Sequence, residues 1–176
     1  MMTDTKYNFL VQQYKHRIYS YSMYLLKNRM DADDITQEVL IRIWKNIGRF
    51  NILAAKTWIM KTTHNLCIDY LRKRSVDLAK NPYSVEDISD FIENKEEQNP
   101  MVKVESKLTD DKIKEAIKLL PENQRSIFVL YEIQGMKYKE ISKILEIPIN
   151  TVKVYLMRAR KQLQIKLSEI KLQEAV

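Results

Sequence analysis

Two side chains that could carry chemistry stand about one helical turn apart in the first half of the chain. His64 and Cys67 have the spacing of a metal-ligand pair, or of a nucleophile with its general base. The chain holds only two histidines and one cysteine, so carboxylates would have to complete a metal site. No glycine-rich phosphate loop occurs either. We therefore expect no enzyme, no cofactor and no bound metal, and we expect both side chains to be partly buried helix residues.

A second candidate for function is the basic stretch EISKILEIPINTVKVYLMRARKQL, residues 140–163. Pro148 lacks a backbone donor and biases the residue before it away from helical angles, so we do not expect one continuous helix through this point. Apolar residues resume at helical spacing after it. The pattern predicts two short helices, the first over 137–145, joined by a tight turn.

The second helix of this pair has an apolar and a cationic face. At roughly 100° per residue, Val152, Leu156, Ala159 and Leu163 share the face that must pack inward. The opposite face and its flanks carry Asn150, Thr151, Lys153, Val154, Met157, Arg158, Arg160 and Lys161. Such a helix can enter a DNA major groove, with cations on phosphates and short side chains near base edges. Asn150 or Thr151 could cap it. The alternative is a helical hairpin with solvated lysines.

The elements that must position these residues are expected to be helices throughout. Two glycines and four prolines leave few sites for the tight turns of a sheet, and the composition is 45% apolar and 30% charged. Helical periodicity predicts helices near 6–28, 31–50 and 56–75, with Gly48 as a plausible end of the second. The fold class is therefore all-α, with two small helical domains.

The two domains are expected at 1–75 and 108–176. Within the second, helices are predicted at 110–120, from Pro121 to Gly135, and in the basic pair. Residues 76–107 contain two prolines, are acidic and lack a sustained helical stripe, which is typical of a linker with at most a helical turn near 85–93.

The net charge of +7 is unevenly distributed. Residues 1–74 carry 13 Lys and Arg against 6 Asp and Glu, residues 75–107 carry 4 against 8, and residues 108–176 carry 13 against 9. Two basic parts joined by an acidic segment favour a polyanionic partner. The start of the sequence shows no signal peptide, no apolar run is long enough to cross a bilayer, and a lone cysteine fits a reducing compartment. We expect a cytoplasmic protein without membrane insertion.

Three stretches together resemble the small, two-region sigma factors of bacterial RNA polymerase, the extracytoplasmic-function class of the sigma-70 family. DADDITQEVLIRIWKN (31–46) is similar to the polymerase-binding segment of region 2, and KTWIMKTTHNLCIDYLRKRS (56–75) to the adjoining segment that melts and reads the minus-ten element. LLPENQRSIFVLYEIQGMKYKEISKILEIPINTVKVYLMRARKQL (119–163) resembles region 4, which reads the minus-thirty-five element. The resemblance implies a promoter-specificity subunit with core RNA polymerase, promoter DNA and an anti-sigma factor as partners.

The resemblance also implies roles for particular residues. The polymerase-binding set is Asp33, Asp34, Gln37 and Glu38. The minus-ten set is Trp58, Asn65, Asp69, Arg72, Lys73 and Arg74, among which Trp58 could instead belong to the core. The minus-thirty-five set is Asn150, Thr151, Lys153, Val154, Tyr155, Arg158, Arg160 and Lys161. Val154 and Tyr155 stand where members often have Ser-Arg, so we expect this chain's own upstream preference. The rival interpretation is a stand-alone helix-turn-helix regulator, although residues 1–74 show no plain dimer interface or ligand pocket.

Overall fold

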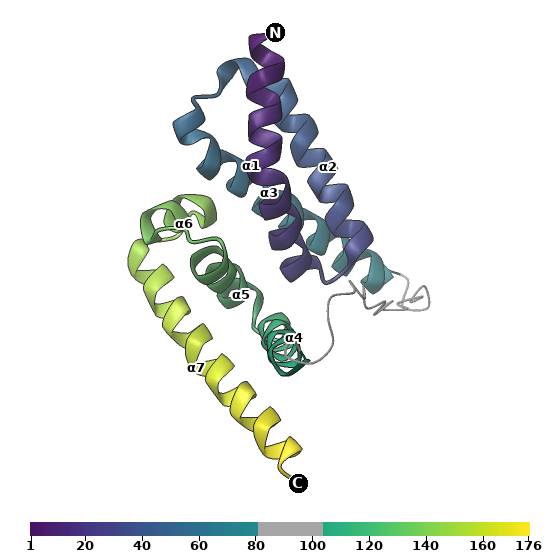
Figure 1. Ribbon diagram of the computed structural model, residues 1–176, viewed down its shortest axis with the longest axis vertical. Helices are drawn as coiled ribbons and strands as arrows, with labels where there is room; N and C mark the ends of the chain where they lie inside the picture. Colours follow the sequence, from purple (N-terminus) through teal and green to yellow (C-terminus); the bar gives the residue numbers. More distant parts are fainter. Residues whose placement is uncertain (81–103) are drawn as a thin grey trace.

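The computed structural model describes residues 1–80 and 104–176 of the chain, and every element in these residues is helical, as the composition predicts (Figure 1). The first group is α1 (Met2–Leu26), α2 (Arg29–Asn46), the 3₁₀ turn η1 (Ile47–Arg49) and α3 (Ile52–Lys80). The second group is α4 (Val104–Lys118), α5 (Glu122–Phe128), the π-helical turn η2 (Val129–Ile133), α6 (Tyr138–Leu145) and α7 (Ile149–Glu174). None of the helices in this described part is long and apolar enough to cross a membrane.

The first group is a three-helix bundle in which α1 packs against both α2 and α3. Its core is formed by apolar side chains at helical spacing, among them Leu10, Ile18, Leu25, Val39, Ile43, Ile59 and Met60. Asn28 begins α2, because its side chain accepts a hydrogen bond from the Asp31 backbone N–H at 3.0 Å. Because Asn28 provides the cap, the carboxylates that follow it are not needed as capping groups, and they interact with the positive end of the helix dipole and with solvent.

Three boundaries described here differ from the sequence-based expectation. The α-helical part of the second helix ends at Asn46 and continues as the turn η1, so Gly48 lies inside this turn rather than ending the helix. Helix α3 runs on to Lys80, and α4 begins at Val104, so helix occupies both ends of the segment expected to be a linker. The turn expected near 85–93 lies outside the described residues.

The second group contains the predicted helix pair. Pro121 precedes α5, where its missing N–H costs nothing, and Gly135 has a φ of 66°, a left-handed conformation that glycine adopts freely. Between α6 and α7 the left-handed residue is Glu146, with a φ of 56°. Pro148 precedes α7 without a side-chain cap. Asn150 and Thr151 lie within the first turn of α7, so the expectation that one of them caps the helix was wrong.

The two groups lie against each other. Helix α6 contacts α3, and α4 and α5 contact α1, while α7 runs along the outer side of the second group toward the C-terminus (Figure 1). Arg125, Ser126 and Gln134 are polar residues of the second group that are buried. The contact between the groups is therefore partly polar.

His64 and Cys67 both contact hydroxyl groups of α1. The Tyr21 hydroxyl lies 2.8 Å from His64 Nδ1, and burial lowers the pKa of His64 to about 4. Cys67 is fully buried with its thiol 3.6 Å from the Ser22 hydroxyl; burial raises its pKa to about 12, and the Ser22 hydrogen bond offsets this only in part. The described residues contain no group of three or more potential metal-ligand side chains. Cys67 is more deeply buried than the sequence suggested, and its thiol stays protonated at neutral pH.

The low pKa of His64 predicts that acid destabilises the fold. The unfolded chain binds a proton at His64 near pH 6.5, whereas the folded chain resists protonation until about pH 4. The free energy of unfolding should therefore fall by about 2 kcal/mol from this group between about pH 7.5 and about pH 5. His64→Gln should reduce that fall, as measured by urea unfolding at both pH values.

The exposed His16 provides the control for this measurement. His16→Gln also removes one histidine, but from the solvent-facing side of α1. An equal pH dependence in wild type and His64→Gln would show that burial of His64 does not control acid stability.

Candidate polymerase and nucleic-acid interfaces

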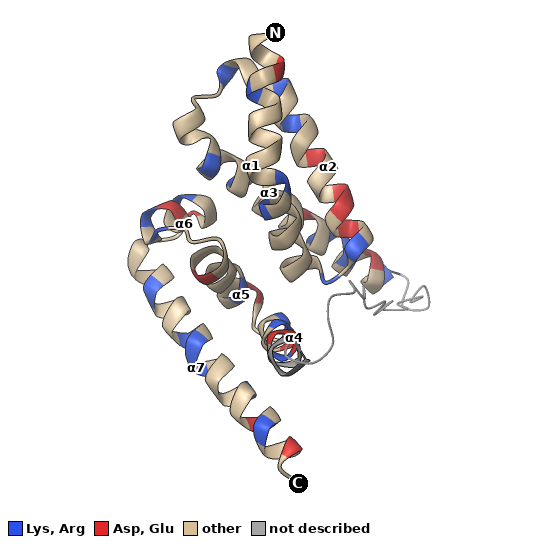
Figure 2. Ribbon diagram, in the orientation of Figure 1, with Lys and Arg blue, Asp and Glu red and all other residues tan. Residues whose placement is uncertain are grey.

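Helix α7 presents the cationic face that its sequence predicts. Val152, Leu156, Ala159 and Leu163 are buried, with exposed fractions of 6% or less. The opposite side of the helix is exposed at Asn150, Lys153, Val154, Met157, Arg158, Arg160 and Lys161, whereas Thr151 and Tyr155 are half-buried. Figure 2 shows the blue segments of Lys and Arg spaced along α7. The packing therefore turns the charged side of this helix outward.

Aromatic rings from outside α7 hold two of these cations in place. Tyr131 and Tyr138 stack with their centroids 4.9 Å apart and their planes 10° from parallel. The Arg160 guanidinium lies 5.4 Å from the Tyr131 centroid, and the Lys153 ammonium lies 5.7 Å from that of Tyr138. We call these four residues the aromatic-cation stack. The stack joins α7 to η2 and to the start of α6, and it therefore fixes the positions of the Lys153 and Arg160 side chains.

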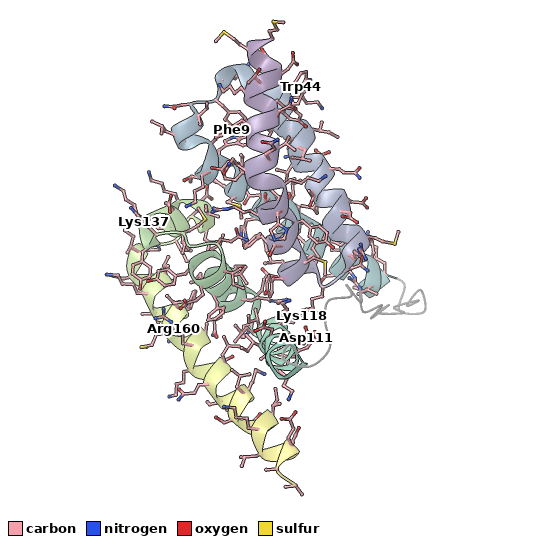
Figure 3. The ribbon with its side chains drawn as sticks, viewed as in Figure 1. Phe9, Trp44, Asp111, Lys118, Lys137 and Arg160 are labelled. Carbon is pink, nitrogen blue, oxygen red and sulfur yellow. The ribbon has the colours of Figure 1, made fainter. Side chains whose placement is uncertain are left out.

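Arg160 and Arg158 have different surroundings. Arg160 Nε donates to Glu132 Oε1 at 2.8 Å, and a second guanidinium nitrogen bonds to the same carboxylate. This hydrogen bond to Glu132 raises the pKa of Arg160. Arg158 lies 5.9 Å from the ring of Tyr155 on its own helix. Arg160 lies near the middle of α7 (Figure 3), and because Glu132 of η2 holds its guanidinium it is partly committed to structure.

Helix α3 gathers most of the expected minus-ten residues on one side. Asn65, Asp69 and Arg72 are exposed at spacings of four and three residues, which places them on one helical face. Arg72 pairs with Asp69 at 2.9 Å. Lys73 is exposed beside them, while Arg74 is half-buried and lines a cleft between α1, α3 and α5.

Trp58 lies toward the N-terminal end of α3. Its ring meets Phe50 edge to face at a centroid distance of 4.6 Å, and it is half-buried against the core. Trp58 therefore belongs in part to the core. Its role in DNA binding stays a prediction.

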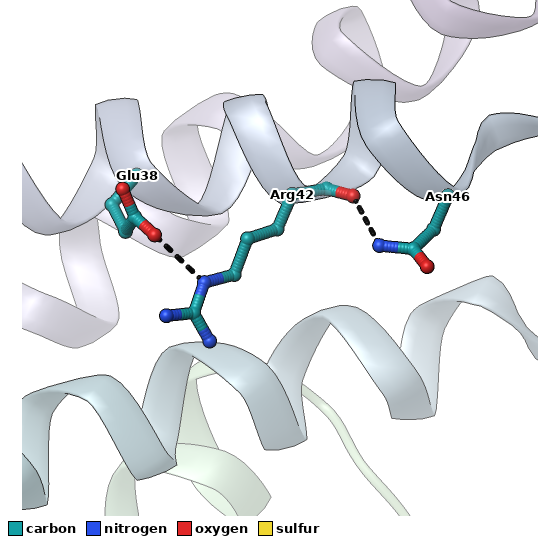
Figure 4. Close-up of polar contacts among 3 residues, drawn as sticks. All are labelled: Glu38, Arg42 and Asn46. Atoms are coloured by element: carbon teal, nitrogen blue, oxygen red, sulfur yellow. Dashed lines mark hydrogen bonds and ion pairs between the residues drawn. The ribbon is translucent and has the colours of Figure 1, made fainter.

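Helix α2 carries the acidic set on its outer surface. Asp33, Asp34 and Gln37 are exposed, and Glu38 is half-buried. Arg42 Nε donates to Glu38 Oε1 at 2.8 Å, and the Asn46 amide donates to the Arg42 carbonyl oxygen at 2.8 Å (Figure 4). In Figure 2 the red segments of α2 lie on the side of the first group that is farther from α6 and α7. A surface of this kind, in a basic domain, is suited to a basic protein rather than to DNA.

Two apolar side chains extend this acidic surface, and the sequence analysis did not assign them to it. Ile41 and Trp44 are each 46% exposed, and the Trp44 ring packs edge to face on Tyr7 at 5.0 Å (Figure 3). A helical wheel drawn from the sequence indicates that Trp44 is exposed, because it falls roughly 180° from Ile35, which is buried. Large exposed apolar groups beside charged ones are typical of a protein interface.

The aromatic-cation stack was missed for a different reason. Tyr131 and Tyr138 belong to different helical segments, and no periodicity within one helix brings them together. Apart from its charge, nothing in the sequence indicated that Glu132 would contact α7. Only the packing of η2 against α6 places these side chains next to α7.

Family models match both halves of the chain. The model described as "Sigma-70 region 2" matches residues 10–76, and the model described as "Sigma-70, region 4" matches residues 110–163. The first covers most of the bundle, including the acidic set and the expected minus-ten residues, and the second covers the helix pair with the aromatic-cation stack.

Two named proteins are similar to this chain over most of its length. The ECF RNA polymerase sigma factor SigW of Bacillus subtilis is 32% identical over 168 residues, which are 92% of this chain and 88% of SigW. The ECF RNA polymerase sigma factor SigE of Mycolicibacterium smegmatis is 30% identical over 88% of this chain, and the match spans 59% of SigE.

A solved structure shares the fold. The sigma factor RpoE of Bartonella quintana, in its complex with the anti-sigma factor NepR, superposes with a TM-score of 0.71 over 92% of this chain and 96% of RpoE, at 20% identity. The match to SigW over nearly the whole of both chains, with the two region models in the same order, establishes the family. This chain belongs to the extracytoplasmic-function (ECF) RNA polymerase sigma factors, the promoter-specificity subunits that direct transcription initiation.

Proposed function

We propose that this sigma factor binds core RNA polymerase through α2 and reads a two-part promoter through α3 and α7. The single observation that carries this proposal is the separation of charge by surface, acidic on α2 and cationic on α3 and α7. A single polyanionic partner cannot bind both the acidic and the cationic surfaces. A basic protein surface that binds α2, together with DNA that binds α3 and α7, accounts for all three surfaces.

The polymerase contact is proposed at Asp33, Asp34, Gln37 and Glu38, with Ile41 and Trp44 at its edge. The carboxylates provide charge and steering, while the half-exposed Trp44 offers apolar area to bury. Because Arg42 holds Glu38 at 2.8 Å, this carboxylate is already oriented before a partner arrives. The surface therefore combines an aromatic anchor with a charged rim, as protein interfaces commonly do.

The minus-ten element is proposed to lie along α3. Trp58 offers a ring on which an unpaired base can stack, which is worth about 1–3 kcal/mol per base. Asn65 and Asp69 provide hydrogen-bonding groups for base edges, and Arg72, Lys73 and Arg74 provide cations for the backbone phosphates. This arrangement traps single strands and needs no catalytic group.

The minus-thirty-five element is proposed to contact α7. The start of the helix carries Asn150, Thr151 and Lys153, followed by Val154, Tyr155 and Arg158, with Arg160 and Lys161 beyond them. Exposed Val154 and Met157 can meet thymine methyl groups, and Arg158 can reach a base or a phosphate. We propose that Arg160 acts mainly through the aromatic-cation stack, since its guanidinium is held by Glu132.

The remaining parts of the proposal concern organisation and partners. We propose region 2 at 1–75, a linker at 76–107 and region 4 at 108–176, in a cytoplasmic protein that catalyses no reaction itself. An anti-sigma factor is a further proposed partner, supported by the fold shared with RpoE, which was solved with one. The similarity to sigma factors across both halves disfavours a stand-alone helix-turn-helix regulator.

The polymerase contact predicts that reversing charge on α2 weakens assembly. Asp34→Arg together with Glu38→Arg should weaken binding to core RNA polymerase about tenfold or more, because both substitutions place cations against a basic partner. Size-exclusion chromatography with core polymerase at moderate salt measures this, and circular dichroism checks the fold.

Asp4→Arg with Asp77→Arg is the matched control for the α2 variant. It makes the same change in net charge at two exposed positions outside α2. Unchanged co-elution of the Asp34/Glu38 variant would rule out α2 as the polymerase contact.

The different surroundings of Arg158 and Arg160 predict two different defects. Arg158→Ala should weaken binding of the holoenzyme to upstream-element DNA by about 1–3 kcal/mol and leave stability nearly unchanged. Arg160→Ala should lower the free energy of unfolding by about 1 kcal/mol, because it removes the Glu132 ion pair and a cation–π contact. Filter binding and urea unfolding of both variants measure the two effects. Equal losses of stability would contradict this division of roles.

A further inference from the structure

Lys6, near the start of α1, binds the turn that leads into α3. Its ammonium donates a hydrogen bond to the Ile47 carbonyl oxygen at 3.1 Å and a second one to the carbonyl oxygen of Phe50. Ile47 begins the turn η1 and Phe50 follows its last residue, so one side chain contacts both ends of the turn. An ammonium with three donors suits this position, because the end of a helical turn leaves carbonyl oxygens without helical partners.

The Lys6 ammonium is held by the protein rather than by solvent alone. Its side chain is half-buried, and its two acceptors lie 41 and 44 positions further along the sequence. Hydrogen bonds from a charged donor are stronger than those between neutral groups. The turn is therefore held against α1 by a charge-assisted contact in addition to the burial of Ile47.

Phe50 connects this contact to Trp58. The Lys6 ammonium binds the backbone carbonyl of Phe50, and the Phe50 ring meets the Trp58 ring with the two planes 76° apart. The bound carbonyl and the packed ring belong to the same residue, so a displacement of the Phe50 backbone also moves its ring. Loss of the Lys6 contact should therefore loosen the indole of Trp58.

The next residue of α1, Tyr7, makes a corresponding contact with α2. Its ring packs on Trp44, which lies at the edge of the proposed polymerase contact. Lys6 and Tyr7 are consecutive helical residues, so their side chains leave α1 roughly 100° apart. A single turn of α1 thus contacts one ring proposed for the polymerase surface and the turn beside a ring proposed for DNA.

We propose that Lys6 is a positioning residue for promoter melting, which holds the turn before α3 so that Trp58 is placed to stack on an unpaired base. This inference rests on the proposed function for the role of Trp58 in the minus-ten element. A ring that is already held in place loses less conformational freedom when a base stacks on it. Lys6 acts through Phe50 and Trp58, because its ammonium is directed at the two carbonyl oxygens.

Acrylamide quenching of fluorescence from the free full chain tests whether Lys6 holds the ring. The chain has two tryptophans, so Trp44→Phe leaves Trp58 as the single emitting indole and keeps an aromatic ring against Tyr7. In this background Lys6→Met should raise the quenching constant about twofold, because a loosened indole meets solvent more often. Lys6→Arg should restore most of the original value, since a guanidinium can donate to the same oxygens. An unchanged quenching constant in Lys6→Met overturns the proposal.

Lys15→Met is the matched control for this measurement. Lys15 is exposed on α1, and its replacement makes the same change in net charge. It should leave the quenching of Trp58 unchanged, and an equal rise in both variants overturns the proposal. Phe50→Leu provides a second route that leaves Lys6 in place. It should also raise the quenching constant, and Lys6→Met should add little to it, because both changes act on the same contact.

Promoter melting by the holoenzyme tests the functional consequence. The probe is a duplex that the wild-type holoenzyme selects from a random-sequence library, labelled with 2-aminopurine in its minus-ten element. Lys6→Met should slow the rise in fluorescence about tenfold, within the range that loss of one base stack produces. Initial binding of the duplex should change less than about twofold, because it depends on α7 and on phosphate contacts. Lys6→Arg should restore the rate, and Lys15→Met should not alter it.

A double substitution distinguishes positioning from a direct contact with phosphate. Trp58→Leu removes the ring and keeps an apolar side chain against the core. In this background Lys6→Met should slow melting little further, because both residues act through the same ring. Fully additive effects of the two substitutions are expected of a direct phosphate contact, and they overturn the proposal.

These tests separate this inference from the proposed function. Unchanged melting by Trp58→Leu refutes the minus-ten role of Trp58, while the quenching comparison still decides whether Lys6 holds its ring. Slowed melting by Trp58→Leu, with unchanged quenching in Lys6→Met, refutes the positioning role and leaves the DNA contact of Trp58 standing.

Discussion

The structure depends on one constraint, which is that each functional helix must bury an apolar stripe and thereby turn its opposite face outward. In α7 the stripe from Val152 to Leu163 is nearly inaccessible, so the cations must face solvent. In α2 the burial of Val39 and Ile43 sends the carboxylates outward in the same way. Burial of the apolar stripes therefore determines which way the charged side chains point, although the buried residues themselves face away from any partner.

The outward faces of these helices differ in chemistry. The α2 surface joins carboxylates to a half-exposed tryptophan, which suits a protein. The α3 and α7 surfaces carry cations with amide and apolar groups between them, which suits nucleic acid. Within region 4 the aromatic-cation stack adds rigidity, since Tyr131 and Tyr138 tie η2 and α6 to the base of the recognition helix.

The contact between the regions links these surfaces to each other. Charged side chains of α3 have partners in the second group of helices, as Lys61 has in Glu146. Glu146 lies at the left-handed turn between α6 and α7. A glycine at this position would close the turn equally well but could not contact Lys61.

The sequence by itself determined the helices, the inward stripes and the family, since these follow from periodicity, proline breaks and motifs read along one helix at a time. The break at Pro148 and a helix end at Gly135 were also predicted from the sequence. Tertiary structure alone decided the exposure of Ile41, the stack around Tyr131 and the burial of Arg125. The last two depend on how separate helices meet, and a local pattern carries no information on contacts between residues about a hundred positions apart, such as Arg125 with Leu25.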